Sequence, residues 1–225
     1  SIKKIITLDG KVYAGGTAVF PMRISFAEEA RRIVEHTALI GQTRVAAVHI
    51  DNPGAKVPVD AARQALQARG SNLAGEFTLA QDGSDAQAKA KLVVALNPQG
   101  VILSASNAAA ASFIKAFRAA GGTSQFYATS FLDGAQLHKD VGEAATGVVI
   151  MQVVPSPKSP MRVAAEYRAA MQSIGAGDEL SYPSFEGFIA AKALVEALKK
   201  VPAGSMKPAA VQAALQGMTR QDLGG

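Results

Sequence analysis

Hydroxyl and amide side chains that can bind an anion follow two apolar segments near the middle of the chain. Residues 101–103 lead into one group and residues 125–128 into the other. The polar residues of the two groups are Ser104, Ser106, Asn107, Thr129 and Ser130. A helix beginning at the first group would point its unbonded N–H groups and the positive end of its dipole at a carboxylate. Serine and asparagine also cap ordinary helices, which is the simpler interpretation of Ser106 or Asn107 alone, but the recurrence at Ser130 favours a binding site.

A strand, a helix and a second strand must position these side chains. Residues 101–103 are an apolar run of strand character, whereas Phe113, Ile114 and Phe117 recur with the period of a helix. Gly121-Gly122 ends that helix before the second strand. Two parallel strands joined by a helix place their carboxyl ends at one edge of a sheet, where open α/β folds bind ligands. That edge is the candidate site.

The same alternation of strand and helix extends over residues 26–154 and predicts a three-layer parallel α/β sheet. We expect strands at 44–50, 73–79, 101–103, 125–128 and 147–154, and helices at 26–40, 58–68, 84–96, 107–120 and 134–139. Residues 2–14 predict a hairpin with Asp9-Gly10 at its turn. Beyond the proline-rich segment 155–160, further helices without strands are expected at 161–174, 183–200 and 207–218.

Composition excludes several classes of protein. The chain of 225 residues has no cysteine, so disulfides, thiolate metal sites and a cysteine nucleophile are excluded. Its net charge of +5 comes from lysines and arginines scattered along helices, whereas a nucleic-acid groove needs clustered basic residues with aromatics among them. No stretch approaches the ~18 apolar residues of a membrane span. The sequence shows no signal peptide, which a mature exported chain would also lack.

No catalytic constellation stands out. Of the three histidines, only His49 lies near the end of a strand, where it and Asp51 can share a site, but a structural histidine is the simpler interpretation. The nucleotide-binding glycine motifs, the G-x-S-x-G elbow and metal-ligand spacings are absent. Helix carboxylates are expected to be exposed, except Glu186 in the first turn of its helix. We therefore expect no enzyme, no cofactor and no metal.

Several stretches together resemble the type I periplasmic binding proteins, the solute receptors of ABC transporters for branched-chain amino acids and related compounds. They are residues 20–36, 41–55, 97–121, 126–137, 142–160 and 181–200. Each is weak alone, and their order and spacing carry the resemblance. It implies a flavodoxin-like lobe and a second lobe that close on a ligand by a hinge motion, with an amino or organic acid as the usual ligand.

Carried over by position, the resemblance implies ligand contacts at three loops. The residues are Asn52, Pro53, Ser104, Ser106, Asn107, Thr129, Ser130 and Phe131. Members that bind free amino acids tend to have an aromatic residue in the first loop and an acidic group on the third strand to meet the ammonium. Pro53 and Ser130 stand there instead, which favours an organic or aromatic carboxylate.

The resemblance also implies an incomplete receptor, because nothing in the chain matches the family's first lobe. We expect a hairpin at 1–16, an α/β ligand-binding lobe at 17–156, and a helical segment at 157–225 that belongs with the other lobe. The hairpin resembles the family's carboxyl-terminal strands, so a rearranged chain and a natural hairpin both stay open. Uncovered apolar surface in such a partial chain would favour self-association.

The function expected from the sequence is that of a substrate-binding component of an ABC uptake system. It would bind a small carboxylate between lobes without chemistry, reside in the periplasm and, in the full-length protein, deliver its ligand to the transporter permease. Nucleic acid is not expected as a partner. The alternatives are a flavodoxin-like cofactor-binding enzyme or sensor, a ligand-sensing regulator, and an engineered, isolated lobe that no longer binds ligand.

Overall fold

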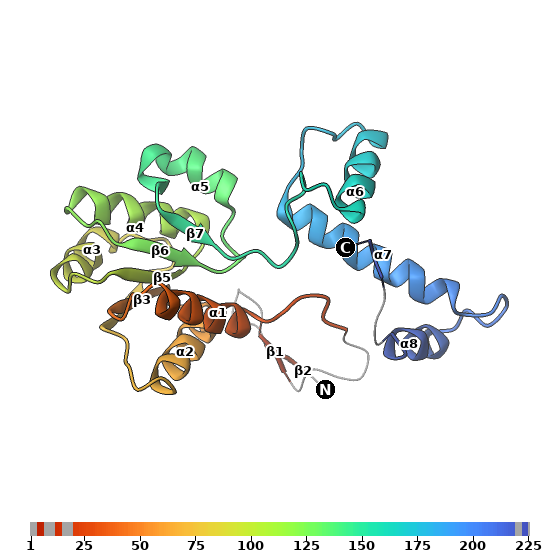
Figure 1. The fold of residues 1–225 in the computed structure, drawn as a ribbon, viewed down its shortest axis with the longest axis horizontal. Coiled ribbons are helices and arrows are strands. Elements are labelled where there is room, and N and C mark those ends of the chain that lie inside the picture. Colours follow the sequence, from red (N-terminus) through yellow and green to blue (C-terminus); the bar gives the residue numbers. More distant parts are fainter. Residues whose placement is uncertain (1–3, 7–11, 15–19, 219–221, 225) are drawn as a thin grey trace. The chain divides into compact units, whose positions relative to one another are not determined.

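The computed structural model describes residues 4–6, 12–14, 20–218 and 222–224. These residues divide into two compact units (Figure 1). The α/β unit contains residues 24–151 together with strands β1 and β2. The helical unit contains residues 20–23, 152–218 and 222–224. The domain boundaries expected from the sequence, at 16/17 and 156/157, remain predictions.

A five-stranded parallel sheet forms the centre of the α/β unit. Its strands are β3 (Val45–Ile50), β4 (Gly75–Leu79), β5 (Gly100–Ser104), β6 (Gln125–Ala128) and β7 (Val148–Ile150), in the order β4-β3-β5-β6-β7. The helices are α1 (Phe26–Leu39), α2 (Pro53–Gln67), α3 (Ala86–Ala95), α4 (Asn107–Ala119) and α5 (Gly134–Val141), followed by the short 3-10 helix η1 (Gly142–Ala145). The predicted three-layer parallel α/β fold is confirmed.

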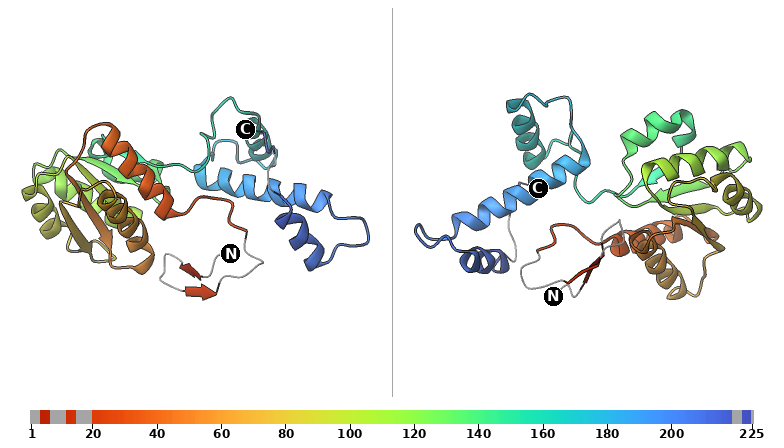
Figure 2. Two further views of the ribbon diagram at one scale, coloured as in Figure 1. Left: turned by 60° about the horizontal axis from the view of Figure 1, so that its bottom comes forward. Right: turned by 180° about the vertical axis from the view of Figure 1, so that it is seen from behind.

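Side chains of β3, β5, β6 and β7 alternate between two cores, one on each face of the sheet. Ile102 packs with α1 and α2, whereas Val101 and Leu103 pack with α3 and α4. Figures 1 and 2 show α1 and α2 on one side of the sheet, and α3, α4 and α5 on the other. Strands buried on both faces read as continuous apolar runs, which explains why the sequence of β3 shows no alternation.

Aromatic rings fill the core between β6 and α4. The Phe117 ring lies 5.1 Å from the Phe126 ring, and Phe113 lies 6.1 Å from Phe126, both centroid to centroid and edge to face. Each of these fully buried side chains contributes about 1.5–3 kcal/mol to folding. Gly122 permits this packing, because a Cβ atom there would collide with Cε1 of Phe117.

Helix α2 begins at Pro53, five residues before the predicted start at Pro58, so that prediction is wrong. Asn52 caps the helix and Pro53 occupies its first position, where the missing N–H is not needed. Pro58 lies inside the helix and cannot donate to the carbonyl of Gly54.

Strand β7 is shorter than predicted and ends at Ile150, not at residue 154. The N–H of Met151 donates to the carbonyl of Ala128 at 2.9 Å, and Ala128 is the last residue of the neighbouring strand β6. Beyond that bond β6 offers no further ladder partner, so β7 cannot continue along it.

The predicted hairpin is confirmed for its strands. Strand β1 (Lys4–Ile6) pairs antiparallel with β2 (Val12–Ala14) in a sheet of two strands, whereas the expected turn at Asp9-Gly10 lies outside the described residues. The described residues of β1 pair with β2 and not with the main sheet. Strand pairing thus gives no support to a rearranged hairpin, which remains a hypothesis.

The helical unit confirms the helices expected after the proline-rich segment. They are α6 (Arg162–Ser173), α7 (Tyr182–Lys199) and α8 (Pro208–Gln216). A small core holds α6 to α7, with the ring of Tyr167 stacked 4.7 Å from that of Phe185. Glu186 is not in the first turn of α7 as expected; it lies one turn further on and forms an ion pair with Arg23 at 3.4 Å. Among the described residues, no helix has the length and apolar character of a membrane span.

Candidate functional site

The polar residues predicted from the sequence gather at the carboxyl edge of the sheet in the α/β unit. Strands β3, β5 and β6 are neighbours, and their ends lie level because His49 pairs with Ser104 and Leu103 with Ala128. The three loops that leave these strands therefore lie next to one another. These loops, together with the strand and helix residues directly next to them, carry all eight residues that the resemblance implies as ligand contacts.

Asn52 and Pro53 form the start of α2 in the first loop. Asn52 is 7% exposed, and its Oδ1 accepts hydrogen bonds from the N–H groups of Gly54 at 2.8 Å and Ala55 at 3.4 Å. The side-chain oxygen of Asn52 therefore caps the N-terminus of α2. Pro53 is exposed and has no N–H, and its carbonyl lies within α2, so it can offer a ligand only apolar surface.

Ser104 lies at the end of β5 and Ser106 in the second loop, and the two have different roles. Ser104 is the buried last residue of β5. The Oγ of Ser106 accepts from the N–H of Ala109 at 3.4 Å, so Ser106 is the N-cap of α4. This cap uses a lone pair of the hydroxyl and leaves its O–H as a donor. Ser106 can therefore cap α4 and still donate a hydrogen bond to a ligand.

Asn107 links the second loop to the third. Its Nδ2 donates to the carbonyl of Asp133 at 2.8 Å, and its Oδ1 accepts from the N–H of Asp133 at 3.1 Å. Asp133 in turn caps α5, with its carboxylate accepting from the N–H groups of Ala135 and Gln136. The side chain of Asn107 thus positions the loop after β6.

Thr129, Ser130 and Phe131 form the third loop. Thr129 is buried, Ser130 is partly exposed, and Phe131 is 36% exposed. The Phe131 ring packs edge-on against that of Phe26 at 6.2 Å between centroids, so the first turn of α1 reaches this loop. An apolar ring thus borders the polar groups at the edge.

Glu29 is a residue of this site that the sequence analysis missed. It is 0% exposed, and its carboxylate accepts from the N–H of Ser130 at 2.7 Å and from the Ser130 hydroxyl at 2.9 Å. The expectation that helix carboxylates are exposed is wrong here. The signal was available, because Glu29 stands three residues after Phe26 and four before Ile33, on the apolar face of α1.

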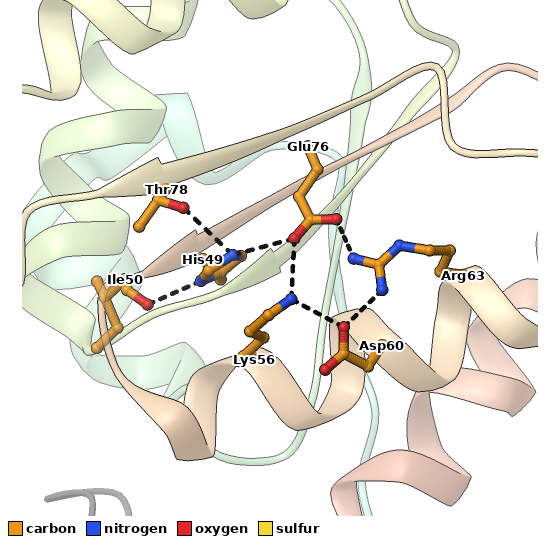
Figure 3. A network of polar contacts seen from close by, with 7 residues as sticks. All are labelled: His49, Ile50, Lys56, Asp60, Arg63, Glu76 and Thr78. Carbon is orange, nitrogen blue, oxygen red and sulfur yellow. Dashed lines mark hydrogen bonds and ion pairs between the residues drawn. The ribbon is translucent and has the colours of Figure 1, made fainter.

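His49 belongs to a separate polar network between β3, β4 and α2 (Figure 3). Its Nε2 lies 3.4 Å from Oε1 of Glu76, and its Nδ1 lies 2.8 Å from the carbonyl oxygen of Ile50. Asp51 is exposed, and its N–H donates to the carbonyl of Leu79. The hydrogen bonds and ion pair of His49 lead to Ile50, Thr78 and Glu76 and not to Asp51, which favours the structural interpretation of His49 over a site shared with Asp51.

Charged groups extend this network to the surface of α2 (Figure 3). Glu76 pairs with Arg63 and, at 3.4 Å, with Lys56; Asp60 pairs with Lys56 at 2.9 Å and with Arg63 at 2.6 Å. Burial alone would raise the pKa of Glu76, but the hydrogen bonds and charges of Arg63 and Lys56 lower it. The same opposition lowers the pKa of Asp60. The network joins edge strand β4 to α2, and the lowered pKa values keep Glu76 and Asp60 charged at neutral pH.

No group of three or more histidines and carboxylates in the described part of the chain is arranged to hold a metal ion. The loops at the sheet edge instead present hydroxyl, amide and backbone groups. Such groups can bind a small polar ligand by hydrogen bonds.

Comparison with known families identifies the fold's relatives. The family model described as Periplasmic binding protein matches residues 6–225. The chain belongs to this family. The family expected from the sequence is therefore confirmed. The comparison with curated proteins gave no match.

Solved structures of periplasmic binding proteins share the fold. A substrate-binding periplasmic protein from Ralstonia solanacearum is 28% identical with a TM-score of 0.84 over 93% of this chain and 60% of its own. An extracellular ligand-binding receptor from Verminephrobacter eiseniae is also 28% identical, with a TM-score of 0.84 over 94% and 61%. A possible leucine/isoleucine/valine-binding protein from Rhodopirellula baltica is 26% identical, with a TM-score of 0.75 over 90% and 56%. This chain thus spans less than two thirds of these binding proteins.

Proposed function

We propose that this chain is part of a solute receptor of an ABC uptake system, and that its α/β unit supplies one wall of a site for a small carboxylate. The observation that carries the proposal is the convergence of three polar loops at the ends of β3, β5 and β6. The complete receptor would work in the periplasm, deliver its ligand to a permease and perform no chemistry.

Chemistry at the edge supports a carboxylate. The N-terminus of α4 points at this edge, the O–H of Ser106 is a donor there, and the helix dipole favours a negative charge. Phe131 offers an apolar surface beside these donors. A small acid with an apolar part meets both requirements. The name of the Rhodopirellula baltica protein, a possible leucine/isoleucine/valine-binding protein, agrees with such a ligand.

An NMR titration of the 15N-labelled chain tests this proposal and detects weak binding. Acetate, benzoate and L-valine would be added separately at millimolar concentrations. We expect at least one of them to shift amide resonances of residues 52–55, 104–109 and 129–131. Ser106→Ala should weaken that response, whereas Ser112→Ala, an exposed serine on the same helix, should not. Shifts that avoid the three loops, or no shifts with any acid, would contradict the proposal.

A further inference from the structure

A groove of about 400 Å³ lies on the surface of the α/β unit between α3 and α4. The two helices pack side by side on one face of the sheet (Figure 1). Side chains from both helices line the groove, among them Lys91 of α3 and Lys115 of α4. Lys115 lies about 12 Å along the axis of α4 from its first residue, at 1.5 Å per residue. The groove is therefore separate from the polar loops at the sheet edge.

Every polar side chain that lines the groove can donate a hydrogen bond, and none of them is acidic. They are Gln87, Lys91, Ser112 and Lys115. Among the described residues, these four side chains form no hydrogen bond and the two lysines form no ion pair. Neighbouring basic groups are engaged, since Lys89 pairs with Asp85 at 3.9 Å and Arg118 donates to three backbone carbonyls. The groove thus presents two positive charges that the described part of the chain does not neutralise.

The apolar part of the groove suits a helix better than a small molecule. Ala116 and Ala119 line it, and small side chains at a contact let the backbone of another helix approach closely. A small-molecule site encloses most of its ligand, whereas Lys91, Lys115 and Ala119 are all exposed. An open groove between two helices is instead a shape in which an amphipathic helix docks.

We propose that the groove between α3 and α4 docks an acidic helix of a partner protein. The partner helix packs an alanine-like face on Ala116 and Ala119, and its flanking carboxylates pair with Lys91 on one wall and Lys115 on the other. Complementary charge gives such an interface its specificity. A second copy of this chain is a poor occupant, because two copies with a net charge of +5 each repel one another. A flat lipid surface does not reach the concave alanine floor.

Two synthetic helical peptides test the proposal. Both have an alanine face, which is flanked by glutamates in one peptide and by glutamines in the other. Each would be added at millimolar concentration to the 15N-labelled chain and followed by NMR. We expect the glutamate peptide to shift amide resonances of residues 87–91 and 112–120, and to bind about fivefold more tightly than the glutamine peptide. Resonances of the polar loops should not move, so this result does not depend on the carboxylate site.

Three variants assign the contacts. Lys91→Gln combined with Lys115→Gln should weaken binding of the glutamate peptide about fivefold, because each exposed ion pair contributes a factor of about two to three. Lys139→Gln combined with Lys158→Gln removes the same net charge at exposed positions outside the groove, and should change the affinity by less than about twofold because salt screens distant charges. Ala119→Trp, at an exposed position, should block the groove and abolish binding while both lysines remain.

Several results would overturn the proposal. The first is failure of the glutamate peptide to bind, and the second is full affinity in the variant that lacks Lys91 and Lys115. If inorganic phosphate gives the same shifts and the peptide adds none, the lysines bind an adventitious ion only. Co-sedimentation with phosphatidylglycerol vesicles, without binding of the peptide, would assign the surface to a membrane. A dimer in sedimentation velocity that Ala119→Trp disrupts would assign the groove to a second copy.

Discussion

The side-chain amide of Asn107 and the backbone amide of Asp133 exchange two hydrogen bonds, at 2.8 and 3.1 Å. The bonds join the start of α4 to the cap of α5, so two loops at the sheet edge move as one. The side-chain amide of Asn107 is thus engaged with the protein backbone.

Removal of this link is expected to cost stability. Asn107→Ala removes both bonds and should lower the free energy of unfolding by about 0.5–1.5 kcal/mol, because Asp133 is exposed and water can replace the lost partner. Asn107→Asp should be at least as harmful, because it places a carboxylate oxygen against the carbonyl of Asp133. Urea unfolding followed by circular dichroism measures both. Asn72→Ala, at an exposed loop, is the control, and an equal loss there would refute a specific role for Asn107.

Replacement of two glycines by alanine is expected to change the stability of the chain in opposite directions. Gly122→Ala places Cβ against the Phe117 ring and should destabilise the chain by about 1–3 kcal/mol through overpacking. Gly187→Ala, inside α7 with nothing within 4 Å of the added Cβ, should stabilise it by up to about 1 kcal/mol because alanine is the better helix former. Thermal unfolding of both variants checks the sign, and a destabilising Gly187→Ala would count against open space around that position.

The charged network on α2 predicts a loss of stability in acid. The lowered pKa values of Glu76 and Asp60 mean that the folded state binds these protons less readily than the unfolded state, whose ordinary values are 4.5 and 3.8. Their contribution is thus fully present above about pH 5 and disappears as the pH falls through the lowered values. Arg63→Gln should remove part of it.

Urea unfolding at neutral pH and at pH 3 tests this expectation. The difference in unfolding free energy between the wild type and Arg63→Gln should be about 1 kcal/mol at neutral pH and smaller at pH 3. Arg69→Gln, at an exposed arginine outside the network, controls for the change in net charge. A difference that grows in acid would mean that the two carboxylates do not stabilise the fold in their charged form.

The hydroxyl of Tyr167 ties α6 to the start of α7. It accepts from the N–H of Ser181 at 3.2 Å and bonds the hydroxyl of Ser184. Tyr167→Phe keeps the stack on Phe185 but removes these bonds, and should cost about 1 kcal/mol of unfolding free energy. Tyr182→Phe serves as the matched control. If both variants melt alike, the hydroxyl of Tyr167 has no special role.

Local sequence patterns were sufficient to predict the α/β layers. The run in β3 is buried at all six positions, and the aromatic residues of α4 recur with helical period, so strand and helix are readable without any long-range information. The start of α2 was less readable because two prolines compete for the first position. Because Asn52 caps the helix, α2 begins at Pro53 and not at Pro58.

Contacts between distant residues could not be read from the sequence. Glu29 and Ser130 are 101 residues apart, and only the folded sheet brings the first turn of α1 to the end of β6. The length of β7 has a similar origin, since it ends where its neighbour β6 ends and not where its own apolar run does. The polar loops were predicted as a group, but the direction of each hydrogen bond needed the structure.

The small core of the helical unit is expected to affect how quickly its backbone amides exchange with solvent. Its fully enclosed cluster consists of four buried residues, Val163, Ala164, Tyr167 and Phe185, and α8 has none of its own among the described residues. Because the free energy of local opening follows the apolar contacts that opening breaks, backbone amides of α8 will exchange with deuterated solvent long before those of β3. The first cuts by a protease should accordingly fall near this helix, while the sheet that carries the polar loops stays intact.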